Sequence, residues 1–167
     1  MIDSGRWNDN VSWELHEATE VPPLELCTAV FCIAIAEVDK IVLTKVARGW
    51  SLLGGHIEDN ETALDALVRE SQEEGGFTPH NPQLFAYKKL TSRVPVVHQD
   101  PTKMYPFPTS YMLYYWATTK HPLVDPHGTE VLEHGVFTVQ DATRLNDSGR
   151  MIVDLGYTLF LNEQSRH

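Results

Sequence analysis

"GGHIEDNETALDALVRESQEEGG", residues 54–76, carries seven acidic side chains and a single arginine. Its apolar residues recur at the spacing of one helix face: Ala63, Leu64, Leu67 and Val68. Asp59 or Asn60 can cap this helix, and the glycine pair at 75–76 can end it. The segment therefore predicts a helix with a glycine pair before it and another at its end.

Three glutamates gather at the C-terminal end of the predicted helix. Glu70, Glu73 and Glu74 stand at positions i, i+3 and i+4, so their carboxylates project from one edge. The helix dipole disfavours each of these charges by about 0.3–1 kcal/mol, and two partly desolvated carboxylates about 4 Å apart repel by about 4 kcal/mol. A solvated acidic face is the simpler alternative, because Arg69 can pair with Glu73. A divalent cation that prefers oxygen ligands, such as Mg²⁺, accounts for the cluster better.

The spacing of these residues resembles the Nudix box, G-x5-E-x7-R-E-U-x-E-E-x-G-U, in which U is a bulky aliphatic residue. All seven fixed residues are present: Gly55, Glu61, Arg69, Glu70, Glu73, Glu74 and Gly76. The chain departs from the family at Ser71, where an aliphatic residue is usual, and at Leu53, where many members have proline. The resemblance covers roughly residues 25–140. It implies an α/β (α+β) fold, a Nudix-type α/β/α sandwich with a mixed β-sheet between helices, in a single domain over residues 1–167.

The resemblance also implies a reaction and a set of metal ligands. The reaction is metal-dependent hydrolysis of a pyrophosphate bond in a nucleoside diphosphate linked to another moiety X, such as a nucleoside triphosphate, nucleotide sugar or dinucleotide. The implied ligands of Mg²⁺ or Mn²⁺ are the carbonyl of Gly55 and the carboxylates of Glu70, Glu73 and Glu74. Glu61 and Arg69 are expected to pair and to hold the loop against the helix.

The catalytic and substrate-binding residues follow less directly from the resemblance. The general base is a box glutamate, Glu70 or Glu73, or a glutamate from a later loop, for which Glu130 is preferred over Glu133. The candidates for contact with substrate are Arg69, His56, Tyr105 and Phe107. The last two lie in "YPFPTS", residues 105–110, which resembles the P-F-P-x-S segment of NADH pyrophosphatases; a rigid entry to a buried strand is the alternative. A catalytically silent Nudix fold that senses a nucleotide or binds a partner is the second function considered, although the intact glutamates favour catalysis.

The rest of the chain alternates strand and helix patterns. Residues 1–25 are expected to be an irregular lead-in with one short strand at 13–16, and residues 27–46 a hairpin that turns at 38–40. Residues 47–58 and the proline-rich 94–108 are expected to be loops. Strands are expected at 83–93, 109–119 and 130–139, and a second helix at 149–164.

Composition limits the partners of the protein. The net charge is −10 and the 13 Lys and Arg residues are dispersed, which disfavours binding to a nucleic-acid polymer. The family resemblance implies a small nucleotide as the partner. The longest apolar run, residues 29–36, is too short to span a bilayer, and the N-terminus lacks a signal pattern, so we expect a cytoplasmic protein. Cys27 and Cys32 are expected to be free and to lie on opposite faces of a strand. The family resemblance also makes a homodimer a possibility.

Overall fold

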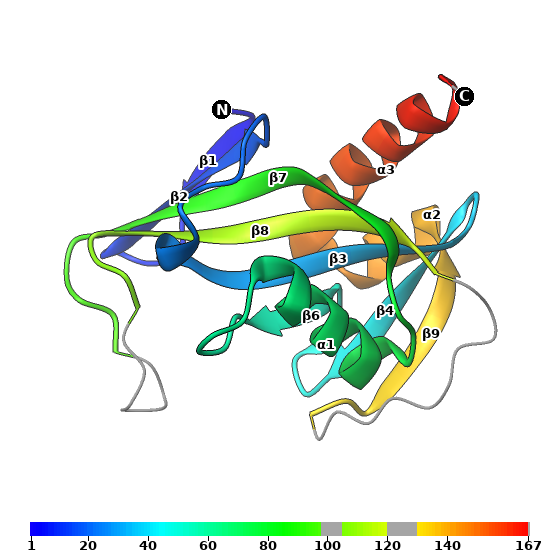
Figure 1. Cartoon of the computed structure of the whole chain (residues 1–167), viewed down its shortest axis with the longest axis horizontal. Helices are drawn as coiled ribbons and strands as arrows, with labels where there is room; N and C mark the ends of the chain where they lie inside the picture. Colours follow the sequence, from blue (N-terminus) through cyan, green and yellow to red (C-terminus); the bar gives the residue numbers. More distant parts are fainter. Residues whose placement is uncertain (98–104, 120–129, 167) are drawn as a thin grey trace.

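The computed structural model describes residues 1–97, 105–119 and 130–166. These residues form a nine-stranded sheet in the order β1-β2-β7-β8-β3-β4-β5, with β6 paired to β3 and β9 paired to β4 (Figure 1). The strands are β1 Asp3–Arg6, β2 Val11–Glu17, β3 Cys27–Glu37, β4 Lys40–Val46, β5 Gly49–Ser51, β6 Leu53–His56, β7 His80–Ser92, β8 Thr109–Thr118 and β9 Glu133–Thr138. The helices are α1 Ala63–Gly75, α2 Val139–Leu145 and α3 Arg150–Gln164, with short 3-10 turns η1 Leu24–Leu26 and η2 Asp147–Gly149. Strands β3 and β8 run parallel and the other pairings are antiparallel, so the sheet is mixed.

Helix α1 covers one face of the sheet. Its apolar side chains Ala63, Ala66 and Leu67 are buried in one hydrophobic cluster with Val30 of β3 and Leu53 of β6. Of the four predicted positions, Ala63 and Leu67 are confirmed as buried, whereas Val68 is partly exposed. Leu64, expected to anchor the helix, is 48% exposed, while Ala66 faces the sheet. The alanines let the helix backbone come close to β6, which carries the first glycine pair.

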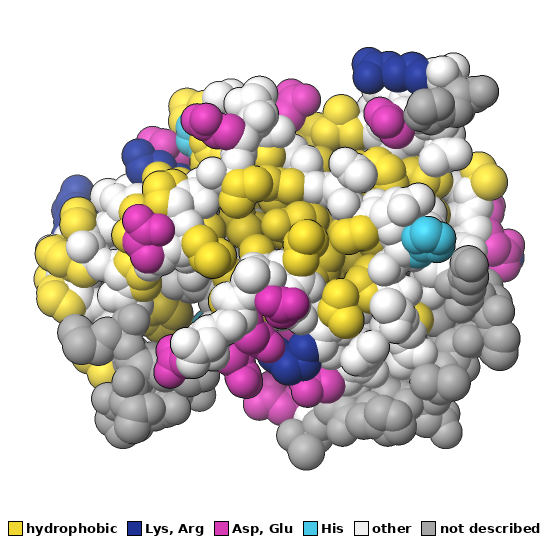
Figure 2. Space-filling view, viewed as in Figure 1, with side chains coloured by type: hydrophobic (Ala, Val, Ile, Leu, Met, Phe, Trp, Pro, Cys, Tyr) yellow, Lys and Arg dark blue, Asp and Glu magenta, His cyan; other side chains and the backbone are white. Residues whose placement is uncertain are grey.

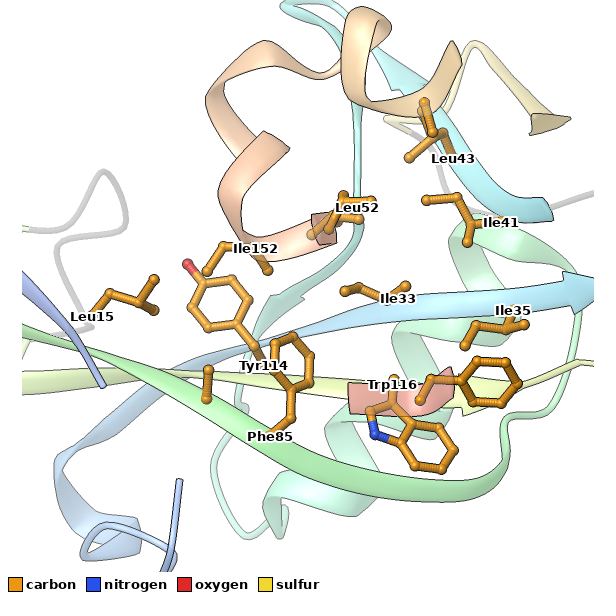
Figure 3. Packing of buried hydrophobic residues seen from close by; sticks show 14 residues of the cluster. Leu15, Ile33, Ile35, Ile41, Leu43, Leu52, Phe85, Tyr114, Trp116 and Ile152 are labelled. Atoms are coloured by element: carbon orange, nitrogen blue, oxygen red, sulfur yellow. The ribbon is translucent and has the colours of Figure 1, made fainter. Parts of the chain in front are cut away.

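The opposite face is covered by α2 and α3. Ile152, Val153 and Phe160 of α3 pack in a second cluster with side chains from the central strands, among them Ile33 and Trp116 (Figure 3). Helices therefore lie on both faces of a mixed sheet. The predicted α/β/α fold is confirmed.

The N-terminal segment corrects the expected irregular lead-in. Strands β1 and β2 form an antiparallel hairpin, and β2 joins the sheet by pairing with β7, from Val11 opposite Ser92 onward. The reason is the alternation within β2, where Val11 and Leu15 are buried in the core between more exposed neighbours. The prediction of a short strand at 13–16 identified only the middle of this element.

Three further details differ from the sequence-based expectation. Residues 49–51 and 53–56, expected to be loop, are the short strands β5 and β6, and α2 was not expected. The two cysteines are free as predicted, but both lie in the cluster under α1 rather than on opposite faces. An irregularity in the pairing of β3 with β8 between Cys27 and Ala29 shifts the alternation there. No helix in the described parts of the chain is both long and apolar enough to cross a membrane.

Candidate metal and catalytic site

The N-cap of helix α1 is Thr62, two residues after Asn60 and three after Asp59, the predicted caps. The hydroxyl of Thr62 accepts a hydrogen bond from the backbone N–H of Asp65 at 3.1 Å, and the Asp65 carboxylate accepts one from the backbone N–H of Thr62 at 2.9 Å. This reciprocal capping box makes Asp59 or Asn60 unnecessary as a cap, and Asn60 instead takes a positive φ of 67° in the preceding turn. The cap fixes where the helix starts and therefore which face carries the glutamates.

The helix ends where the second glycine pair predicts. Gly76 adopts the left-handed conformation, with φ of 67°, and its N–H donates to the carbonyl of Gln72 at 3.2 Å. A Cβ at Gly75 would come within 2.3 Å of a Leu53 side-chain carbon, so this glycine lets the last turn pack closely on β6. The helix end and β6 are thereby held side by side.

The first glycine pair brings the backbone of β6 against two of the box carboxylates. The N–H of Gly54 donates to Oε2 of Glu74 at 2.9 Å. A Cβ at Gly55 would lie 2.3 Å from Oε1 of Glu70, so a larger residue could not occupy this position without displacing that carboxylate. The structure thus brings Gly55, Glu70 and Glu74 together in one place. Figure 2 shows acidic side chains clustered around a basic group at this part of the surface.

Arg69 organises the remaining carboxylates. Its Nε and one Nη donate to the two oxygens of Glu61 at 2.7 and 3.0 Å, a bidentate pair that confirms the expected partnership. The other Nη donates to Glu70 at 2.7 Å and to Glu73 at 3.3 Å, and a further bond of 2.9 Å reaches the carbonyl of His56. These five acceptors match the five N–H donors of a guanidinium group. The geometry therefore favours a positioning role for Arg69 over direct contact with substrate.

Burial and mutual repulsion perturb the carboxylates. The pKa of Glu74 is raised from 4.5 to about 7, mainly by burial and further by the charges of Glu70 and Glu130, while its bond to Gly54 and the charge of Arg48 act in the opposite direction. Burial also raises the pKa of Glu70, against the lowering effect of Arg69. In this arrangement the ionised forms of Glu70 and Glu74 are destabilised. A bound cation would reverse that preference.

The donor set suits a hard divalent cation. The carboxylates of Glu70 and Glu74 are largely buried, and Gly55 leaves room for them where a Cβ would not. Within the described ranges, no three acidic, histidine or cysteine side chains converge as a complete ligand shell, because Glu70 and Glu73 face Arg69. The Glu73 side chain is 47% exposed, so it can turn from Arg69 toward a cation without unpacking the core.

The other predicted site residues lie at different distances from the box carboxylates. His56 and Tyr105 lie together, with His56 Nε2 and the Tyr105 hydroxyl 2.8 Å apart, so the proline-rich segment contacts the box strand. Glu130 is exposed but close enough to influence the pKa of Glu74. Glu133 instead pairs with Lys45 at 3.2 Å. Phe107 is half exposed.

A comparison with protein families agrees with this geometry. A family model described as NUDIX domain matches residues 25–155. The chain belongs to the NUDIX domain family. With all seven fixed residues of the Nudix box present, the predicted class, a Nudix pyrophosphohydrolase, is confirmed.

Solved structures share the fold at low sequence identity. The pyrophosphohydrolase BsRppH of Bacillus subtilis aligns with a TM-score of 0.59 and 17% identity, over 81% of this chain and 77% of that one. An Ap4A hydrolase of C. elegans aligns with a TM-score of 0.53 and 16% identity, over 81% and 98%. The MutT protein of Bacillus halodurans aligns with a TM-score of 0.52 and 22% identity, over 75% and 78%. A search of curated proteins found no match.

Sequence reasoning missed two contributors to the Nudix site. Arg48, in the connection between β4 and β5, lowers the pKa of Glu74, and Gly54 donates to the same carboxylate. The signal for Gly54 was present in the doubled glycine. No local pattern marks Arg48, because its effect depends on the fold bringing that connection near the end of α1.

Proposed function

We propose that this Nudix pyrophosphohydrolase uses Mg²⁺ or Mn²⁺ to hydrolyse the pyrophosphate bond of a nucleoside diphosphate linked to a moiety X. The observation that supports this most directly is the close approach of the Gly54-Gly55 backbone to Glu70 and Glu74, two largely buried carboxylates with raised pKa values. Such a group of oxygens is unfavourable alone and favourable around a divalent cation.

Each residue of the Nudix box has a separate task in this proposal. Glu70, Glu73, Glu74 and the carbonyl of Gly55 would hold the metal. The bound cation would neutralise the pyrophosphate oxygens and favour the ionised form of an attacking water. Arg69 and Glu61 fix the loop to the helix, since the bidentate pair ties residues eight positions apart. The Gly54 N–H keeps Glu74 oriented toward β6.

Glu130 is the general base in this proposal. It stands just before β9 and is exposed, so its carboxylate is accessible to a water molecule at the site. Its charge acts on Glu74, which supports a position for Glu130 near the proposed metal ligands. A water that attacks one phosphorus would transfer a proton to this carboxylate while the bond from that phosphorus to the bridging oxygen breaks. The leaving group would be phosphorylated X if the α-phosphorus is attacked, or the nucleoside monophosphate if the β-phosphorus is attacked.

The test is a product screen with purified protein. Nucleoside triphosphates, ADP-ribose, NADH, dinucleoside polyphosphates and nucleotide sugars are incubated with Mg²⁺ or Mn²⁺ in ¹⁸O-labelled water. We expect at least one substrate to yield a nucleoside monophosphate, with ¹⁸O in one of the two phosphate-bearing products. Nucleotide binding without turnover of any substrate would instead support the silent, nucleotide-sensing alternative.

A further inference from the structure

A small cavity opens at one end of the sheet, where β7 ends, β8 begins and the β1–β2 hairpin turns. Figure 1 shows these segments together at the left end of the sheet. The cavity has a volume of about 220 Å³. We call it the hairpin pocket; its lining includes Trp7, Val11, Tyr105, Pro106, Pro108 and Met112.

Two contacts connect the hairpin pocket to the Nudix box. The hydroxyl of Tyr105, which lines the pocket, lies 2.8 Å from Nε2 of His56 at the end of β6. Thr28, also in the lining, accepts a hydrogen bond from the backbone N–H of Ile57 at 3.1 Å. The pocket is therefore next to the strand whose glycines approach the box carboxylates. A substrate with its phosphates at the box can reach it with an adjoining group.

The chemistry of the lining selects what that group is. None of the described residues that line the pocket carries a charge at neutral pH, and most are apolar or aromatic. A phosphate or a sugar phosphate would lose its hydration there without gaining a partner of opposite charge. The volume is also below the roughly 300–1,000 Å³ of pockets that enclose a drug-sized ligand. The pocket thus fits one uncharged planar ring system.

Trp7 provides an aromatic surface at the rim. It is 51% exposed, so a large part of the indole ring faces solvent, and a large, amphipathic ring of this kind is enriched at binding interfaces. The turn that carries it is held by its own hydrogen bonds: Trp7 N–H donates to the carbonyl of Val11 at 2.9 Å, and the Asn8 side-chain oxygen accepts the N–H groups of Asn10 and Val11. The indole is therefore presented by a fixed turn. This turn lies outside residues 25–155, the part that matches the family model.

We propose that the hairpin pocket binds the nucleobase of the substrate and that Trp7 contributes to it by stacking. This proposal rests on the proposed function for the identity of the ligand. It adds that the end of the substrate recognised by the protein is the base, and that X lies outside the pocket. The N-terminal hairpin then determines specificity, although it carries no residue of the Nudix box.

The test measures binding without turnover. ¹⁵N-labelled wild-type protein, with a chelator to exclude metals, is titrated with AMP, GMP, CMP and UMP, and with ribose 5-phosphate as the ligand that lacks a base. We expect at least one nucleotide to shift the Trp7 indole N–H and the amides of Thr28 and Met112, while ribose 5-phosphate leaves them unchanged. Equal shifts with ribose 5-phosphate, or no shift in these signals with any nucleotide, would overturn the proposal.

Three variants sharpen the test. Trp7→Ala should weaken nucleotide binding at least about fivefold, because stacking on an aromatic side chain contributes that much per base, and Trp7→Phe should restore most of it. Val38→Ala is the matched control, an exposed apolar side chain on the turn between β3 and β4, and should bind as wild type does. Wild-type affinity in Trp7→Ala would refute the role of the indole.

Kinetic measurements distinguish a failure of the hairpin-pocket proposal from a failure of the proposed hydrolase function on which it rests. If a nucleotide is hydrolysed, Trp7→Ala should raise KM and leave kcat nearly unchanged, since the indole is remote from the scissile bond. Hydrolysis with an unaltered KM in Trp7→Ala would overturn the pocket and leave the proposed function standing. Base-dependent NMR shifts without hydrolysis of any substrate would support the hairpin pocket and overturn the proposed function.

Discussion

Replacing Glu74 with glutamine should stabilise the metal-free protein at alkaline pH, although the same change is expected to abolish activity. In the folded chain this carboxyl is buried and lies near the charges of Glu70 and Glu130, and its pKa is raised from 4.5 to about 7. Glutamine keeps an oxygen that can accept the hydrogen bond from Gly54 but carries no charge. Glu74→Gln therefore removes the repulsion from Glu70 and Glu130 and retains the hydrogen bond from Gly54.

The magnitude follows from the raised pKa. A carboxyl whose pKa is higher in the folded state binds its proton more tightly there, so its ionisation destabilises the fold as pH rises through 4.5 toward 7 and above. A difference of this size corresponds to about 3 kcal/mol of unfolding free energy at pH 8, and to less than about 1 kcal/mol at pH 5. Glu74→Gln should recover most of this difference at pH 8. For a chain of this length, that is a rise in Tm of about 6–12 °C.

The assay is urea unfolding followed by tryptophan fluorescence, at pH 5 and pH 8, with a chelator and then with saturating Mg²⁺. Without metal, the variant should exceed wild type in unfolding free energy at pH 8 and nearly equal it at pH 5. Saturating Mg²⁺ should stabilise wild type more than the variant, because a ligand that binds only the folded state adds to its stability.

The control is Glu20→Gln, which removes one exposed carboxylate from the connection between β2 and η1. It makes the same change in net charge and should leave both unfolding curves unchanged. The reasoning fails if Glu74→Gln is less stable than wild type at pH 8 without metal. It also fails if Mg²⁺ stabilises both proteins equally.

Three further predictions concern the residues around this carboxylate. Arg69→Lys should lower the unfolding free energy by about 2 kcal/mol in urea melts, because lysine cannot replace the bidentate bonds to Glu61 or reach all five acceptors. An unchanged midpoint of urea unfolding would contradict the positioning role of Arg69. Ser71→Ala should be neutral or should raise the unfolding free energy by up to about 1 kcal/mol, since the Ser71 hydroxyl is buried beside the Cys32 thiol but outside hydrogen-bond geometry. Ser71→Leu should lower the unfolding free energy by about 1–3 kcal/mol by overpacking, and a clear loss of stability in Ser71→Ala would show that the hydroxyl does form a hydrogen bond. Glu130→Gln should lower kcat by about 10²–10⁴-fold with little change in the circular dichroism spectrum. Its control, Glu133→Gln, loses only the surface pair with Lys45 and should keep kcat within about twofold of wild type, so equal effects of the two changes would refute Glu130 as the base.

The box helix was predictable because its information is local. The spacing of Glu70, Glu73 and Glu74 fixes which side chains share an edge once the segment is helical, and the glycine at 76 marks its end. Position 64 was misassigned because Leu64 is more hydrophobic than Ala66, and hydrophobicity was taken as a guide to burial. The close approach of α1 to β6 reverses that order, since a small side chain fits the interface better.

Features that depend on distant parts of the chain could not be predicted in the same way. Strand β1 was missed and β2 was only partly predicted, because the pairing of β1 with β2 and of β2 with β7 follows a register that no local pattern reveals. The contact between His56 and Tyr105 joins residues 49 positions apart, and Arg48 and Glu130 lie 26 and 56 positions from Glu74, the carboxyl whose pKa they influence. The sequence could propose these residues only individually. Their arrangement follows from the sheet.

The central claim is that the carboxylates at the end of α1 hold a divalent cation that is required for pyrophosphate hydrolysis. The most direct test compares wild type and Glu74→Gln on the best substrate of the product screen, across a Mg²⁺ titration that starts from chelated protein. We predict saturable, Mg²⁺-dependent turnover by wild type and no turnover by the variant, whose unfolding curve shows that it is fully folded. Metal-independent turnover by wild type, or wild-type turnover by the variant at any Mg²⁺ concentration, would contradict the claim.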